Sequence, residues 1–103
     1  MLSENRVYHF RGEVVLRKSR VKNAPNYPRD DEQNWLFLQV GKFQYSFVYK
    51  IQKPFEAEYE KPFIIYMAFT VGEKVKDIIQ VNNTYDVLRA IEPIGIVIII
   101  DII

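Results

Sequence analysis

Apolar and polar side chains alternate at the start of the chain. Over residues 7–17 the apolar positions of this pattern are Tyr8, Phe10, Gly12, Val14 and Leu16. A period of two is typical of a strand with one buried face, so the pattern predicts a first strand here. From Lys18 to Gln33 the sequence turns polar and contains two prolines, which predicts one long surface loop. Loops of that length are uncommon in small domains unless they have a function.

The middle of the chain has the pattern of a β-hairpin followed by a further strand. Residues 35–40 are mostly apolar, Gly41-Lys42 is a turn dipeptide, and residues 43–51 alternate again. Prolines interrupt the pattern over 52–62, and Phe63 to Thr70 restores it. The sequence therefore predicts two paired strands, a break and a third strand.

Residues 75–81 are ambiguous, because Val75, Ile78 and Ile79 fit either a short helical turn or a strand. We favour a strand there. Turns are expected over 71–74 and 82–84, and a strand over 85–91, after which Glu92 to Gly95 leads into the last one.

The chain ends on an almost unbroken run of β-branched apolar residues from Gly95 to Ile103. The run is far shorter than the roughly 20 apolar residues of a membrane-spanning helix, and it contains Asp101. We therefore expect it to be the most buried strand of a sheet.

The pattern as a whole gives six or seven strands and no convincing helix. Several strands are apolar on both faces, which favours a closed barrel or a sandwich. The 103 residues, 49% of them hydrophobic, suffice for one core and one domain spanning 1–103. We predict an all-β protein formed by a single small β-barrel.

Composition restricts the chemistry. The chain has no cysteine, which excludes disulfides, thiolate catalysis and zinc–thiolate sites and fits a reducing cytoplasm. The N-terminus lacks the apolar segment of a secretory signal. His9 is the only histidine, and no nucleophile or orienting partner accompanies it. The chain contains no Gly-x-x-x-x-Gly-Lys-Ser/Thr loop for a nucleotide. We expect a cytoplasmic protein without enzymatic activity, cofactor or metal.

Charge is unevenly distributed although the net charge is only +1. The long polar loop is basic and contains one aromatic residue; its candidate contact residues are Lys18, Arg20, Lys22, Tyr27 and Arg29. Cationic groups attract a phosphate backbone and an aromatic ring can stack on a base. Asp30, Asp31 and Glu32 follow directly and repel the same phosphates, so a merely solvated loop is the alternative.

A second charged segment is acidic. Glu56, Glu58 and Glu60 fall on one side of the chain if the segment is extended. Three carboxylates could hold a hard cation, but the calcium-loop pattern is absent. A solvated loop and a surface that attracts a basic protein partner are the remaining interpretations.

Several short motifs occur in an order that resembles a known family. They are Phe10-Arg11-Gly12-Glu13-Val14, Tyr27-Pro28-Arg29 after the basic loop and Pro25, Gly72-Glu73-Lys74-Val75, Leu88-Arg89-Ala90-Ile91 with Glu92, and Ile94-Gly95-Ile96-Val97-Ile98. Over roughly residues 7–102 the series resembles the C-terminal β-barrel domain of elongation factor Tu and related translation GTPases. The family has Gly-Tyr-Arg-Pro where this chain has proline before arginine, it has paired glycines before its last strand, and residues 41–62 have no counterpart. The resemblance implies an elongation-factor-like Greek-key barrel that docks against a GTPase domain and touches the tRNA backbone through its loops.

Two functions follow from these features. The first is a non-enzymatic binding module that contacts RNA backbone or a translation-type partner through the basic loop over 18–29. The alternative is a protein-binding inhibitor or immunity-type protein that uses the acidic segment 56–60 or a sheet edge such as Phe43 to Ile51. The expected partner is a protein or an RNA backbone, with no membrane and no nucleotide. The protein would be a monomer, or a homodimer formed by pairing of the C-terminal strands.

Overall fold

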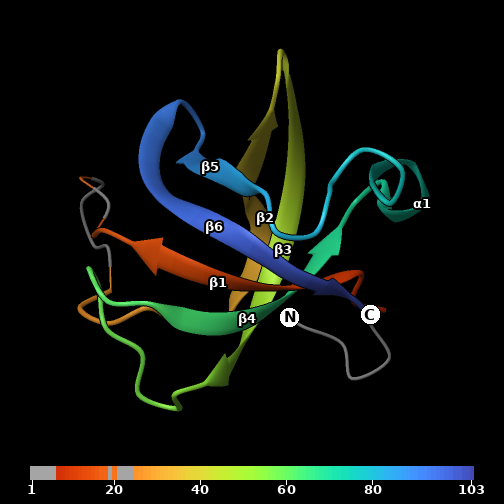
Figure 1. Cartoon of the computed structure of the whole chain (residues 1–103). Helices are drawn as coiled ribbons and strands as arrows, with labels where there is room; N and C mark the ends of the chain where they lie inside the picture. Colours follow the sequence, from red (N-terminus) through yellow and green to blue (C-terminus); the bar gives the residue numbers. More distant parts are fainter. Residues whose placement is uncertain (1–6, 19, 21–24) are drawn as a thin grey trace.

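The computed structural model describes residues 7–18, 20 and 25–103 and shows one closed antiparallel barrel (Figure 1). Its elements are β1 (Phe10–Leu16), β2 (Asp31–Val40), β3 (Phe43–Lys53), β4 (Phe63–Phe69), the short helix α1 (Gly72–Val75), β5 (Thr84–Arg89) and β6 (Glu92–Ile102). The strands follow one another around the barrel in the order β1-β4-β3-β2-β5-β6, and β6 pairs back onto β1. The predicted all-β barrel is confirmed, with six strands.

The strand order determines where the connections lie. β2, β3 and β4 are neighbours joined in sequence, whereas β1 lies beside β4, which is the arrangement of a Greek key. The connection from β1 to β2 must therefore cross one end of the barrel, past the ends of β4 and β3. That end also carries the connection from β3 to β4, and we call it the loop end. In Figure 1, α1 lies on the opposite side of the barrel.

Aromatic and aliphatic side chains from all six strands fill the barrel. Phe10, Phe47 and Phe63 are fully buried, and Phe69 packs edge-on against Phe10 with ring centroids 5.9 Å apart. Burial of such large side chains is the main source of stability in a domain of this size. Among the described residues, no polar or charged side chain is fully buried. The described part of the interior is thus a packed core of aliphatic and aromatic side chains.

The predicted strand over 75–81 is wrong. The chain forms α1 and then turns, with a hydrogen bond from the Ile79 N–H to the Val75 carbonyl of 2.9 Å. Val75 and Ile79 are both buried in the barrel core. Their spacing of four residues is that of one helix face. This helical spacing, and not an alternation, places both apolar side chains against the core.

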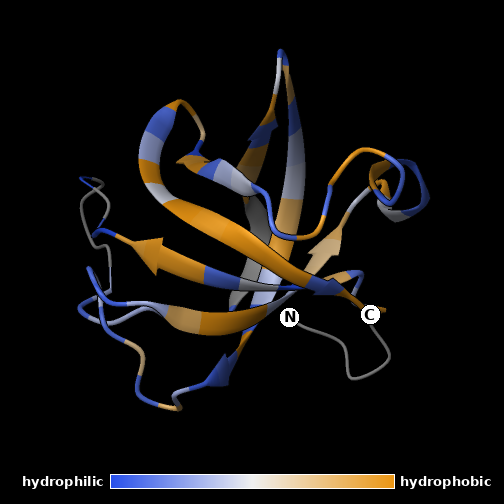
Figure 2. Ribbon diagram, viewed as in Figure 1, coloured by the Kyte–Doolittle hydropathy of each residue, from blue (hydrophilic) through white to orange (hydrophobic). Residues whose placement is uncertain are grey.

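The prediction that the last strand is the most buried strand of the sheet is also wrong, because β6 has three buried residues whereas the shorter β4 has five. Val97 and Ile99 of β6 are fully buried, but Ile96 and Ile98 are 44% and 39% exposed. In a barrel, successive side chains of a strand point alternately to the core and to the outside. Figure 2 shows the middle of β6 as a hydrophobic band on the barrel wall, with hydrophilic positions towards both ends of the strand. The apolar run therefore indicates a strand, but only one of its faces is buried.

Barrel closure removes the sheet edges that a partner could use. β3 lies between β2 and β4, and β6 lies between β5 and β1. A strand that is paired on both sides has no row of backbone groups left for an added strand. Neither the proposed peptide addition at Phe43 to Ile51 nor pairing of C-terminal strands between two chains has an open edge available.

Candidate functional site: a pocket at the loop end of the barrel

Two connections meet at the loop end. The connection from β1 to β2 crosses over the connection from β3 to β4, and two hydrogen bonds join them to each other and to the barrel. The Tyr59 hydroxyl donates to the Pro25 carbonyl at 2.9 Å, and the Glu60 N–H donates to the Leu16 carbonyl at 2.7 Å. The basic loop and the acidic segment therefore lie against each other, through a contact between residues 34 positions apart in sequence.

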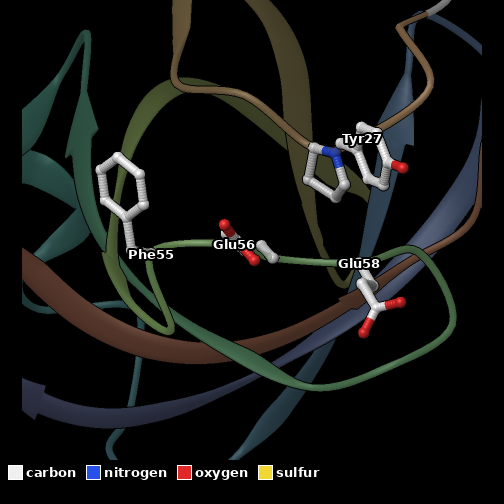
Figure 3. Close-up of a pocket in the computed structure, with 6 residues that line it drawn as sticks. Tyr27, Phe55, Glu56 and Glu58 are labelled. Atoms are coloured by element: carbon white, nitrogen blue, oxygen red, sulfur yellow. The ribbon is translucent and has the colours of Figure 1, made fainter.

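A pocket of about 600 Å³ opens between these connections. It is lined by Tyr27, Pro28, Phe55, Glu56, Ala57 and Glu58. Figure 3 shows Phe55 and Tyr27 towards the two ends of the pocket, with Glu56 between them. We call this set of residues the acidic pocket. Its volume lies within the range of about 300–1,000 Å³ that is common for ligand sites.

The segment that forms one wall of the acidic pocket alternates between core and solvent. Ala57 is 3% exposed and packs in the core, whereas Glu56 and Glu58 on either side of it are exposed and line the pocket. Of the three glutamates that the sequence placed on one side of an extended segment, the structure brings Glu56 and Glu58 to the same pocket. Glu60 does not line the pocket, and its φ of 69° shows that the chain has turned by that residue.

Two large aromatic side chains flank the carboxylates and are open to solvent. Phe55 is 95% exposed and Tyr27 is 65% exposed. A single exposed aromatic residue needs no explanation, but two of them at one concave site offer apolar faces that attract a cation. Sequence analysis selected Tyr27 and missed Phe55. The only signal for Phe55 was an aromatic residue placed between a proline and a glutamate in a polar segment.

The acidic pocket carries unbalanced negative charge. Glu58 forms an ion pair with Lys61 at 3.2 Å, and both side chains are mostly exposed. Such a pair contributes at most about 1 kcal/mol. No described residue forms an ion pair or a hydrogen bond with the Glu56 carboxylate, and no three acidic or histidine residues of the described chain are arranged to hold a metal ion. The pocket fits a cationic group from outside the chain.

The described residues of the predicted basic loop have different contacts. Lys18 donates to the Asn26 side chain at 3.1 Å, and the backbone N–H of Arg20 donates to the Glu92 carboxylate at 3.0 Å. Arg20 thus lies at the start of β6, whereas Lys18 is bound to the residue before Tyr27, and Tyr27 lines the acidic pocket. Arg29 is exposed. Lys22 lies outside the described residues.

His9 lies at the other end of the barrel, away from the acidic pocket. Its ring packs on Gly72, and its Nδ1 accepts a hydrogen bond from the Phe69 N–H at 3.0 Å. Burial, with a smaller contribution from the Lys76 ammonium, lowers the pKa of His9 below its ordinary value. His9 joins the end of β4 to α1, which is a structural role.

The Tyr59 hydroxyl joins the two walls of the site, so its loss has a defined effect. Burial raises the pKa of Tyr59 above 10, against the opposing charges of Arg89 and Arg29. As the pH rises past 10, the unfolded chain loses this proton before the folded one, so the free energy of unfolding falls. We expect Tyr59→Phe to lower the free energy of unfolding by about 1 kcal/mol at pH 8 through the lost hydrogen bond. The variant should also lose less of this free energy than wild type when the pH rises past 10.

Urea unfolding at pH 8 and pH 10.5 measures both effects. Tyr27→Phe is the matched control, because this exposed tyrosine lies on the facing β1–β2 connection and none of the described hydrogen bonds involves its hydroxyl. Tyr27→Phe should leave unchanged both the free energy of unfolding at pH 8 and its decrease between pH 8 and pH 10.5. Equal unfolding free energies for wild type and Tyr59→Phe at pH 8 would show that the hydroxyl does not hold the two connections together.

Comparison of the chain with models of protein families, with curated proteins and with solved structures gave no match. The resemblance to the elongation factor Tu barrel therefore stays a prediction. Within the described part of the chain, no helix is long and apolar enough to span a membrane. The functional argument rests on the acidic pocket.

Proposed function

We propose that this protein is a non-catalytic binding module that holds a basic segment of a partner protein in the acidic pocket. The observation that carries the proposal is that Glu56 and Glu58 line one concave site together with two exposed aromatic side chains, Tyr27 and Phe55. The proposal corresponds to the function that the sequence suggested for the acidic segment, narrowed from 56–60 to the two glutamates that line the pocket.

Charge and shape both support a cationic ligand. Opposite charge accelerates encounter and excludes partners of the wrong sign. The faces of Tyr27 and Phe55 add cation–π attraction and apolar contact area. Both rings are already exposed, so a partner that covers them removes apolar surface from water.

Binding of an RNA backbone through the basic loop is the second candidate. Its support is the exposed position of Arg20 and Arg29, whose guanidinium groups form no hydrogen bond or ion pair with the described residues. The carboxylates of the acidic pocket oppose it, because they lie on the adjoining connection and repel phosphate groups. Arg20 and Arg29 also lie on different parts of the loop.

Charge reversal separates the two candidates. We would immobilise wild type, Glu56→Lys with Glu58→Lys, and Arg20→Glu with Arg29→Glu, and pass native lysate over each, with and without nuclease. Glu60→Lys is the matched control, since this glutamate is on the same segment but outside the pocket. The proposal predicts a stoichiometric protein that survives nuclease and is lost only with the double lysine variant.

The opposite pattern would overturn the proposal. Captured material that disappears with nuclease and with the Arg20 and Arg29 reversal, but stays with the Glu56 and Glu58 reversal, would assign the function to RNA binding. Capture that is equal for the double lysine variant and wild type would exclude the acidic pocket as the site.

A further inference from the structure

The geometry of the acidic pocket points to a more specific ligand, and this step rests on the function proposed above. We infer that the pocket takes an extended peptide segment with two arginines separated by one residue, an Arg-x-Arg pattern. Three features of the described residues carry this inference: the spacing of the two glutamates, the aromatic walls, and the existing ion pair of Glu58.

The spacing of the glutamates sets the spacing of the cations. Ala57 is directed into the core, whereas Glu56 and Glu58 on either side of it line the pocket, so side chains alternate between core and pocket over these three residues as in a short extended stretch. Side chains two residues apart in an extended chain are about 6.5–7 Å apart along it. A partner segment that is also extended presents its own residues i and i+2 at the same interval, and directs residue i+1 to the opposite side. Each carboxylate can then meet one cation.

The aromatic walls favour arginine over lysine. A guanidinium group is planar, stacks on aromatic faces and forms two parallel hydrogen bonds with one carboxylate. Figure 3 shows an aromatic ring towards each end of the pocket, with Glu56 between the two rings and Glu58 at the end where Tyr27 lies. Each arginine therefore has both a carboxylate and a ring within the pocket. A lysine ammonium is more strongly hydrated and lacks the planar fork.

The ion pair between Glu58 and Lys61 is a competitor that the ligand has to displace. Both side chains are mostly exposed, and the pair is monodentate at 3.2 Å. Pairs of this kind contribute little to stability, at most about 1 kcal/mol. A bidentate guanidinium forms the stronger interaction with the same carboxylate. Lys61 thus lowers the affinity for any cationic ligand by a small and measurable factor.

Four short fluorescent peptides of equal net charge test the pattern. They carry Arg-Ala-Arg, Arg-Arg-Ala, Arg-Ala-Ala-Arg or Lys-Ala-Lys between the same neutral flanking residues, and anisotropy at fixed salt gives their dissociation constants. We expect Arg-Ala-Arg to bind about tenfold more tightly than the other three, because only it satisfies both carboxylates and both rings.

Two matched pairs of variants locate the peptide. Lys61→Gln should raise the affinity for Arg-Ala-Arg about threefold by releasing Glu58, whereas Lys42→Gln in the turn between β2 and β3 makes the same charge change without effect. Phe55→Ala should lower the affinity about tenfold, whereas Phe43→Ala, which also removes an exposed phenylalanine, should not. Phe55 and Phe43 are both exposed, so neither change removes a core contact.

The outcomes separate the inference from the function on which it rests. Four equal affinities that all fall with Glu56→Gln would overturn the Arg-x-Arg pattern and leave the basic-segment function standing. If Glu56→Gln and Phe55→Ala leave peptide binding unchanged, or if no peptide binds at low salt, both the Arg-x-Arg pattern and the basic-segment function would be overturned. Stronger binding of a labelled single-stranded RNA of similar length than of any peptide would assign the loop end to nucleic acid.

Discussion

Replacement of Gly95 by alanine should lower the free energy of unfolding by about 3 kcal/mol, the upper part of the usual range for overpacking. Gly95 pairs with Leu16 where β6 meets β1 and closes the barrel. A Cβ at this position would overlap the Val15 carbonyl oxygen and crowd Leu16. The obstacle is backbone, which cannot rotate away as a side chain can, so the two closing strands have to separate locally.

Urea unfolding followed by circular dichroism measures the effect of Gly95→Ala, and Gly41→Ala is the matched control. Gly41 also lies in a β-hairpin region, but no atom outside its neighbours lies within 4 Å of the position of its Cβ. Its φ of 60° is the only cost there, about 1 kcal/mol. A loss for Gly95→Ala no larger than that for Gly41→Ala would contradict the close approach of β1 and β6.

Charge reversal of both pocket glutamates should weaken binding of the Arg-Ala-Arg peptide at least about 100-fold, or roughly 2.7 kcal/mol. Glu56→Lys with Glu58→Lys replaces two attractive contacts with two repulsive ones at a site where the ligand excludes part of the solvent. The remaining interaction with the rings of Tyr27 and Phe55 cannot compensate for this repulsion. Anisotropy titration of the double variant measures the loss.

Two controls show whether the loss of binding in that titration comes from unfolding of the double variant or from a charge change outside the pocket. Both glutamates are exposed, so the free energy of unfolding should change by no more than about 0.5 kcal/mol. Glu60→Lys changes the charge on the same segment outside the pocket and should weaken binding only slightly, through screened long-range repulsion. A loss of peptide affinity below threefold in the double variant, or an equal loss of affinity with Glu60→Lys, would show that the acidic pocket is not the binding site.

The strands were predictable because their signal is local. Alternation in 7–17 and 43–51, and the Gly41-Lys42 turn, identify elements that the structure contains at nearly the same positions. The burial of β6 was predicted wrongly from its apolar run, because a β-branched sequence indicates a preference for strand and does not indicate how many faces of the strand are covered. Residues 75–81 were wrongly predicted as a strand, because the apolar positions of so short a stretch do not distinguish a period of two from a period of four.

The acidic pocket could be predicted only in part. The sequence placed Glu56, Glu58 and Glu60 on one side of an extended segment, and the structure brings Glu56 and Glu58, but not Glu60, to the pocket. Their meeting with Tyr27 depends on β1 lying beside β4, a pairing between distant segments that alternation does not encode. Phe55 had no periodic signal because the β3–β4 connection is irregular. The sequence therefore identified the charged segments, and the strand order brought them together.

The central claim is that a basic segment binds between the two connections at the loop end. Its most direct test is a ¹⁵N–¹H NMR titration of the labelled protein with the Arg-Ala-Arg peptide. The account predicts that the amide signals of Tyr27 and of residues 55–58 shift most, and that those of the outward-facing Ile96 and Ile98 do not shift. Shifts confined to residues 17–20, shifts on the outer wall of β6, or no shifts at millimolar peptide would contradict it.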